Sequence, residues 1–166
     1  MNWRQNVPAA ISNTSPLLYL HRINSMDWLR TLFDSIWVPQ AVVIELAEGR
    51  RRGYDVPDLA VYPWLQVAAP VTIPPEIVNL DLGNGESAVL ALAISNPQRL
   101  LLLDDGLARR AAQNLSFTVW GTLKILLEAK SQGLTDKIAP SVERLRTSGM
   151  WISQDLQQRI LDLAGE

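Results

Sequence analysis

The sequence predicts a three-layer α/β domain with a parallel sheet and a helical C-terminus. Short apolar runs of strand length alternate with segments of helical periodicity, which is the pattern of βαβ units. A chain of 166 residues suits one domain with a sizeable core, and we expect that domain to cover residues 1–166. With 48% hydrophobic and 19% charged residues, the composition is typical of a globular, core-rich protein.

The first third of the chain contains two expected strands and three expected helices. Residues 7–12 form the first apolar run. Ser15 and Pro16 then start a helix, because serine caps free backbone N–H groups and proline fits the first helical position. The same periodicities predict the next elements: a helix over 25–33, a strand over 36–38 and a helix from Pro39 to Ala47.

Prolines interrupt the middle of the chain. After the segment Gly49–Gly53 they recur at Pro57, Pro63, Pro70, Pro74 and Pro75. Because proline donates no backbone hydrogen bond and breaks helices, we expect loops here. The exception is a short strand or edge segment over 65–68.

The signals become clearer from residue 83 onward. Gly83 and Gly85 lead into a helix that is rich in alanine and leucine. The expected elements are, in chain order, a helix over 86–95, a buried strand over 100–103, a helix over 107–115, a short strand over 117–119, and helices near 122–130, 141–147 and 154–164.

The composition excludes several chemistries. The chain has no cysteine, which rules out disulfides, thiolate zinc sites and cysteine nucleophiles. Its one histidine, His21, lies among leucines and is expected on a helix surface. The net charge of −2 argues against nucleic-acid binding by bulk positive charge.

No segment has the pattern of a targeting or membrane sequence. Residues Met1–Asn6 lack the apolar stretch of a signal peptide. The longest apolar run, Ala88–Ile94, is far shorter than the ~20 residues that span a bilayer. We therefore expect a soluble cytoplasmic protein with no membrane partner.

Oxygen-bearing side chains collect where ligands bind in open parallel sheets, at the carboxyl ends of strands. Each has a structural explanation by itself: a helix cap, a charge at a helix N-terminus, a solvated helix face or a turn. Together, with no histidine or cysteine, they suit Mg²⁺ or Mn²⁺, which can activate water for attack on a phosphodiester. The positions are Asn13, Thr14, Glu45, Glu86, Asp104 and Asp105.

Five segments, in this order along the chain, resemble the PIN-domain family of metal-dependent nucleases, which includes the VapC-type toxins. The resemblance is closest to a subgroup of small bacterial PIN proteins. It implies a PIN-like α/β/α domain with a parallel sheet of about five strands, and three or four acids around one or two divalent ions. The segments are ISNTSPLL (11–18), VPQAVVIEL (38–46), LGNGESA (82–88), LLDDGLARRA (102–111) and GTL (121–123).

The resemblance also implies roles for individual residues. The family's acids fall on Glu45, Glu86 and either Asp104 or Asp105, which are the expected catalytic and metal-binding residues. Asn13 stands where the family usually has aspartate, and its amide oxygen can still bind a hard cation but brings no charge. The supporting hydroxyls are those of Thr14 and Thr122, and the expected phosphate-binding residues are Arg109 and Arg110.

The resemblance favours a ribonuclease that is the toxin of a toxin–antitoxin pair, with RNA as substrate and a small antitoxin protein as partner. Because family members commonly dimerise and this chain carries few charges, we also expect a homodimer. The uncharged Asn13 leaves open an alternative, a catalytically weakened PIN-like module that binds RNA or a protein.

A further alternative is a dinucleotide-binding domain. Residues Gly83–Ala88 fit the G-x-G-x-x-[GA] pattern, and Asp104 and Asp105 follow about 20 residues later. Against this hypothesis, Glu86 puts a negative charge where the pyrophosphate should bind.

Two further sets of residues have structural interpretations. Arg50–Arg52 end a helix, where cations are stabilised by the helix dipole. The six tryptophans lie mostly in apolar patterns and are expected in the core or an interface rather than as base-stacking platforms: Trp3, Trp28, Trp37, Trp64, Trp120 and Trp151.

Overall fold

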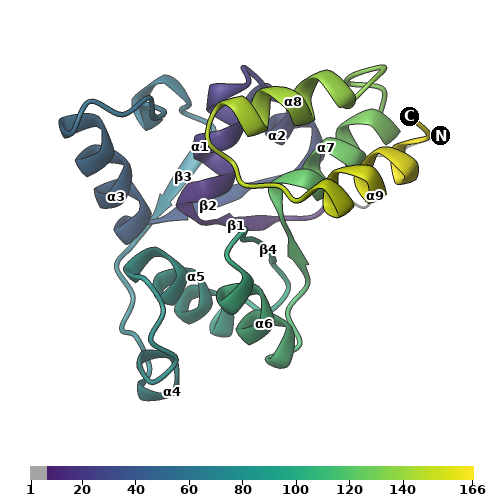
Figure 1. Cartoon of the computed structure of the whole chain (residues 1–166). Coiled ribbons are helices and arrows are strands. Elements are labelled where there is room, and N and C mark those ends of the chain that lie inside the picture. Colours follow the sequence, from purple (N-terminus) through teal and green to yellow (C-terminus); the bar gives the residue numbers. More distant parts are fainter. Residues whose placement is uncertain (1–6) are drawn as a thin grey trace.

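A computed structural model describes residues 7–166 and contains a sheet of five parallel strands in the order β3-β2-β1-β4-β5 (Figure 1). This confirms the expected α/β class and the five-stranded parallel sheet. Met1–Asn6, including Trp3, lie outside the described residues. The strands are β1 (Ala10–Ser12), β2 (Ile36–Pro39), β3 (Leu65–Ala68), β4 (Leu100–Leu102) and β5 (Val119–Trp120).

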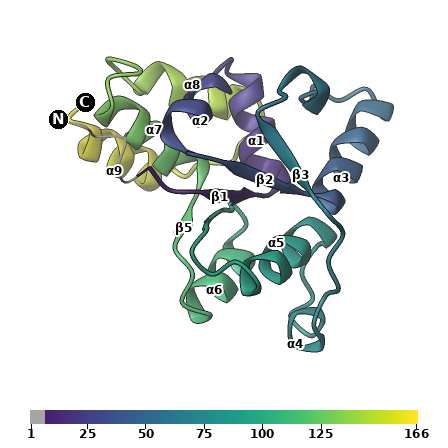
Figure 2. The same ribbon diagram turned by 180° about the vertical axis from the view of Figure 1, so that it is seen from behind.

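Helices cover both faces of the sheet. In Figures 1 and 2, α4, α5 and α6 lie on one side, and α1, α2, α7, α8 and α9 lie on the other. The helices are α1 (Thr14–Arg22), α2 (Asp27–Leu32), α3 (Gln40–Arg51), α4 (Pro75–Val78), α5 (Asn84–Ile94), α6 (Gly106–Asn114), α7 (Thr122–Ser131), α8 (Ala139–Thr147) and α9 (Gln154–Ala164), with a 3₁₀ helix, η2 (Leu59–Val61).

The alternation of side chains along the strands produces two apolar cores. Ala10, Leu100 and Leu102 face the larger core, which is formed with α1, α2, α3, α7, α8 and α9. Their neighbours Ile11 and Leu101 face the smaller core, formed with α4, α5 and α6. Since both faces are covered, the strands consist almost entirely of apolar residues, as in other parallel sheets.

Several element ends differ from the predictions for local reasons. The first strand begins at Ala10, because Pro8 has no N–H to donate to a ladder. The fifth strand begins only at Val119, since the N–H of Phe117 bonds to the carbonyl of Ala112 at the end of α6. Ser116, with a φ of 67°, makes the left-handed turn between them.

Two helical predictions were also wrong in detail. Asn13, not Ser15, occupies the N-cap position of α1, and Ser15 lies in its first turn. The third helix continues through Gly49 to Arg51, because its intrahelical bonds persist past the glycine. The short helix α4 was not predicted, and the surrounding prolines concealed it.

The strand register aligns the loops that follow β1, β4 and β5. Ser12 pairs with Leu102, and Leu102 pairs with Trp120. The N–H of Asn13 donates to the carbonyl of Leu102 at 3.0 Å, and that of Leu103 donates to Trp120 at 3.0 Å. The chain segments after these strands therefore start side by side at one edge of the sheet. Over residues 7–166, none of the helices has the length and apolarity needed to cross a bilayer.

Candidate functional site

A first group of side chains surrounds the start of α5, and we call it the Asn13 cluster: Asn13, Thr14, Glu45, Gly85 and Glu86. The amide nitrogen of Asn13 donates to Oε1 of Glu86 at 2.9 Å. Glu45 Oε1 accepts from the backbone N–H of Gly85 at 2.9 Å, and its Oε2 accepts from the hydroxyl of Thr14. Asn13 directly after β1 and residues from α1, α3 and α5 thus meet at one point, although α1, α3 and α5 are far apart in the sequence.

Gly85 permits this close approach. A Cβ atom at this position would stand 2.5 Å from Oδ1 of Asn13 and 2.8 and 2.9 Å from the carboxylate oxygens of Glu45. Such separations are shorter than van der Waals contact, so any side chain here would push the cluster apart. From the sequence, Gly85 was placed at a helix start, in a segment of the PIN resemblance and in the dinucleotide pattern, but no role in packing was predicted for it. A glycine inside the first turn of a helix, next to Glu86, is the signal that indicates its packing role.

The Asn13 side chain is 1% exposed, and its Oδ1 has no hydrogen-bond partner among residues 7–166. Leaving a buried acceptor unsatisfied costs about 1–3 kcal/mol. This oxygen and both oxygens of Glu45 lie within 3 Å of the same point, the position of the missing Gly85 Cβ. The cluster therefore gathers oxygen acceptors and provides fewer donors than they can use.

The donor set of the Asn13 cluster fits a hard divalent cation. It offers an amide oxygen and two carboxylates, with no nitrogen or sulfur ligand. Mg²⁺ and Mn²⁺ prefer such oxygens, and a cation would satisfy the orphaned Oδ1 of Asn13.

The second group, the Asp104 cluster, consists of Asp104, Arg109, Gly121 and Thr122. Asp104 Oδ1 accepts from the Thr122 backbone N–H and its Oδ2 accepts from the Thr122 hydroxyl, both at 2.7 Å. Burial raises the pKa of the Asp104 carboxyl, while the two Thr122 bonds and the charge of Arg109 oppose that rise. Gly121 leaves room, since a Cβ there would lie 2.7 Å from Arg109 Nη1.

The two consecutive aspartates have different surroundings. Asp105 is exposed and is the N-cap of α6, where its Oδ1 accepts from the Ala108 N–H at 2.9 Å. The capping explanation therefore describes Asp105, whereas Asp104 is half-buried and bonded to Thr122. Sequence spacing left this choice open.

The predicted acids are only partly brought together. Glu45 and Glu86 share the Asn13 cluster, whereas the carboxylate of Asp104 is turned to Thr122. In the described part of the chain, no three histidine, cysteine, aspartate or glutamate side chains form a group that could hold a metal ion. Asn13 adds an amide oxygen to the two glutamate carboxylates of its cluster.

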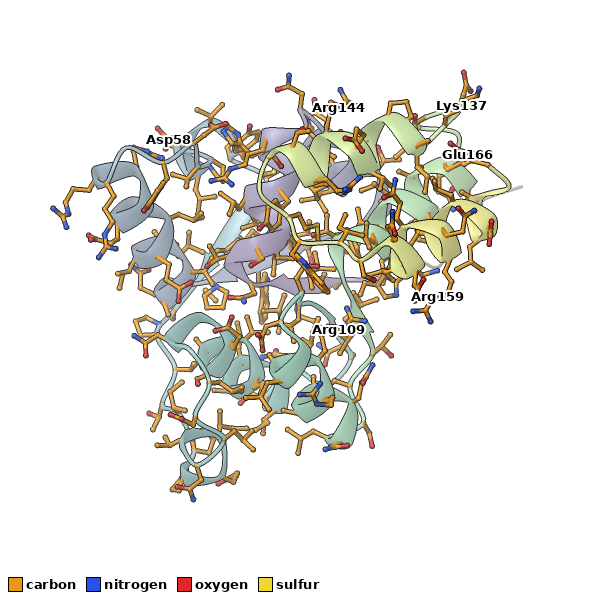
Figure 3. All side chains as sticks on the ribbon, in the orientation of Figure 1. Asp58, Arg109, Lys137, Arg144, Arg159 and Glu166 are labelled. Carbon is orange, nitrogen blue, oxygen red and sulfur yellow. The ribbon has the colours of Figure 1, made fainter. Side chains whose placement is uncertain are left out.

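The arginines named in the sequence analysis have two kinds of surroundings: some bond to carboxylates at the end of α3, and Arg109 lies next to Asp104. Arg51 and Arg52 bond to Glu48 at 2.6 and 2.8 Å, and these contacts lower the pKa of Glu48 to about 2. This agrees with the interpretation of Arg50–Arg52 as a solvated helix end. Arg109 belongs to the Asp104 cluster and lies on α6 (Figure 3), and its Nη1 donates to the carbonyl of Leu103 at 3.0 Å.

Four of the described tryptophans pack against the apolar cores, as predicted, and Trp151 does not. Trp28, Trp64 and Trp120 pack against the larger core and Trp37 against the smaller one. Trp151 is 84% exposed. The local sequence does not indicate this exposure, because Trp151 stands next to the apolar Ile152, which is buried.

A family model described as a PIN domain matches residues 9–166. None of the curated proteins compared with the chain matches it. Among solved structures, the chain is similar to a PilT N-terminus domain protein from the hyperthermophilic archaeon Sulfolobus solfataricus. The two share 14% sequence identity with a TM-score of 0.45, over 88% of this chain and 98% of that one.

Proposed function

This chain belongs to the PIN-domain family, and on that premise we propose that it is a divalent-metal-dependent ribonuclease that hydrolyses phosphodiester bonds in RNA. Members of the family are typically nucleases and generally use divalent metal ions. The observation that carries the proposal for this chain is the orphaned amide oxygen of Asn13, buried beside the carboxylate of Glu45.

The proposed metal ligands are Asn13 Oδ1 and the carboxylates of Glu45 and Glu86. When bound, Mg²⁺ or Mn²⁺ supplies an activated water and stabilises the charge that develops on the phosphodiester. The hydroxyl of Thr14 and the N–H of Gly85 hold Glu45 in place, and the amide of Asn13 holds Glu86. These bonds orient the carboxylates before any ligand arrives, which reduces the reorganisation that binding requires.

The remaining site residues take supporting roles in the proposal. Asp104 supplies a third carboxylate at the same sheet edge, oriented by Thr122. We place Asp104 rather than Asp105 in the site, because the carboxylate of Asp105 caps α6. Arg109 and the exposed Arg110 present guanidinium groups to the phosphates of the strand.

Proteins of this family often bind antitoxins as well as RNA. We propose that this chain is the toxin of such a pair and that it forms a homodimer. An apolar groove of about 470 Å³ next to Glu45 supports a protein partner at this place. Ile44, which is 61% exposed, lies on its rim, so a partner seated there would cover both Ile44 and Glu45.

A second candidate function is a binding module without strong catalysis. The observation that favours it is the uncharged Asn13, which leaves two carboxylates in the cluster. The geometry argues against the alternative of a dinucleotide-binding domain. The glycine-rich turn begins α5, and the carboxylates of Glu45 and Glu86 surround it where a pyrophosphate would bind.

The decisive experiment compares the wild type with Glu45→Gln in RNA cleavage with Mn²⁺ and with EDTA. Glu48→Gln on the same helix is the matched control, since Glu48 bonds only arginines at the solvated helix end. We expect Glu45→Gln to lower cleavage by on the order of 100-fold and Glu48→Gln to leave it unchanged. Equal cleavage by Glu45→Gln, or in EDTA, would refute the metal mechanism. A wild type that binds RNA without cutting it would favour the binding module.

A further inference from the structure

A groove of about 520 Å³ opens beside Asp104, and we call it the Trp151 groove. Its walls come from the first turns of α6 and α7, from α9 and from the loop between α8 and α9. The residues that matter for its chemistry are Asp104, Arg109, Lys124, Trp151, Leu156 and Ile160. Arg109 marks its α6 wall in Figure 3.

Trp151 is the most exposed large apolar side chain in the described part of the protein. A fixed loop presents it. The N–H of Met150 donates to the carbonyl of Leu145 at 3.0 Å, and Ser153 caps α9 through the N–H of Leu156 at 3.2 Å. The hydrogen bonds on either side of Trp151 fix the loop while the indole itself stays exposed to solvent. The indole therefore contributes little to the stability of the fold, and its apolar face is available to a ligand.

The groove combines this indole with cations and a carboxylate. Leu156 and Ile160 form an apolar wall. Arg109 is anchored by its bond to Leu103, and Lys124 reaches Glu128 at 2.5 Å while its Nζ lies 5.4 Å from the centre of the Trp120 ring. A ligand that matches the indole, the apolar wall and the two cations has a flat apolar ring with an anionic group attached, and that group binds on the side of Arg109 and Lys124. An unpaired nucleotide has both parts.

We propose that the Trp151 groove binds one unpaired nucleotide of the RNA strand, with its base stacked on Trp151 and its phosphate paired with Arg109 and Lys124. The proposal rests on the proposed ribonuclease function and adds a subsite for one nucleotide to it. A base inside a duplex has both faces covered by its neighbours, so only a single-stranded segment can offer a free face to the indole. The groove therefore makes the enzyme select unpaired RNA.

The test measures the affinity of a fluorescently labelled single-stranded RNA oligonucleotide by anisotropy, in EDTA so that no cleavage occurs. Trp151→Ala is expected to weaken binding roughly tenfold, the effect of losing one base–aromatic stack. Trp151→Phe, which keeps an aromatic face, is expected to bind within about threefold of the wild type. Leu163→Ala is the matched control, because Leu163 is 74% exposed on α9 and does not line the groove.

A fully duplexed RNA gives the second comparison, and its affinity should be the same for the wild type and Trp151→Ala. Unchanged single-strand affinity in Trp151→Ala, or an equal loss in Leu163→Ala, would overturn the proposal. Because binding is measured without metal, a wild type that cuts no RNA refutes the ribonuclease but not the groove. A wild type that cuts RNA while Trp151→Ala binds and cuts equally well refutes the groove alone.

Discussion

The two acidic clusters at the carboxyl edge of the sheet differ in how their oxygens are satisfied. Both oxygens of Asp104 accept hydrogen bonds from Thr122, with Arg109 nearby. In the Asn13 cluster, by contrast, the buried Oδ1 of Asn13 lacks a donor among the described residues and stands beside the carboxylate of Glu45. The protein itself satisfies both oxygens of Asp104, whereas it leaves one buried oxygen of the Asn13 cluster without a donor, and this oxygen is where we propose that a cation binds. Proximity of acids alone does not distinguish these two situations.

The largest expected effect comes from filling the space at Gly85. Gly85→Ala places a Cβ 2.5 Å from Asn13 Oδ1 and should cost about 3 kcal/mol of unfolding free energy, because buried neighbours must move. It should also abolish Mn²⁺ binding. Gly106→Ala at the start of α6 is the control, since its nearest neighbour would be Arg110 Nη1 at 3.4 Å. Urea unfolding of both variants measures this, and equal stabilities would contradict the packing role of Gly85.

A matched pair of threonines sharpens the comparison. Thr14→Val removes the hydroxyl bond to Glu45, and Thr122→Val removes one to Asp104. Each should cost about 2 kcal/mol of unfolding free energy, the value of a hydrogen bond to a charged group. Only Thr14→Val should weaken Mn²⁺ binding, roughly tenfold, because the Thr14 hydroxyl orients Glu45, a proposed metal ligand. If Thr122→Val weakens Mn²⁺ binding more than Thr14→Val does, the assignment of the two clusters is reversed.

Adding a charge at Asn13 should have opposite effects with and without metal. Without metal, Asn13→Asp loses the donor to Glu86 and places like charges together, so it should destabilise the fold by about 1–2 kcal/mol. With Mn²⁺, the added anion should raise both the affinity and the rate of RNA cleavage. Thermal unfolding with and without Mn²⁺ measures the crossover. A variant destabilised to the same extent in both conditions would show that no cation binds there.

The smallest effect concerns Glu166, a carboxylate that the protein satisfies far from the site. Burial opposes its charge, but Lys130 and the N–H groups of Ile138 and Ala139 outweigh this and lower its pKa from 4.5 to about 2. Because the folded pKa is depressed, this stabilisation is present above pH 4.5 and is lost as the pH falls toward 2.

Glu166→Gln should therefore cost about 1 kcal/mol at neutral pH, the value of a helix N-terminal charge and cap. The difference in unfolding free energy from the wild type should shrink as the pH falls from 4.5 toward 2. Chemical unfolding across this range measures it, and Mn²⁺ binding should stay unchanged. A difference that grows on acidification would contradict the pKa assignment.

Most helices and strands were predictable because the spacing of apolar residues along the chain reflects which side chains are buried. Strands such as Leu100–Leu102 are continuous apolar runs because both sheet faces are covered. The ends of elements depend instead on single hydrogen bonds, such as the one from Phe117 to Ala112, which spacing does not encode.

The site was predictable only in part. Sequence order placed Glu45 and Glu86 at one edge, but their convergence on Asn13 depends on how closely Gly85 of α5 approaches Asn13 and Glu45. The distinct environments of Asp104 and Asp105 depend on Thr122 and Ala108, partners that a linear pattern does not reveal. Trp151 shows the same limit, because the exposure of a residue in the loop between α8 and α9 depends on where the fold places these two helices.

The central claim is that Asn13 and its two glutamates hold a divalent cation, and a Mn²⁺ titration followed by electron paramagnetic resonance of the free ion tests it most directly. We expect the wild type to bind Mn²⁺ and Asn13→Leu, which removes the amide oxygen at similar size, to lose that binding. Asp104→Asn, whose parent carboxylate is already satisfied by Thr122, should weaken it less. Binding that survives in Asn13→Leu but disappears in Asp104→Asn would contradict the claim.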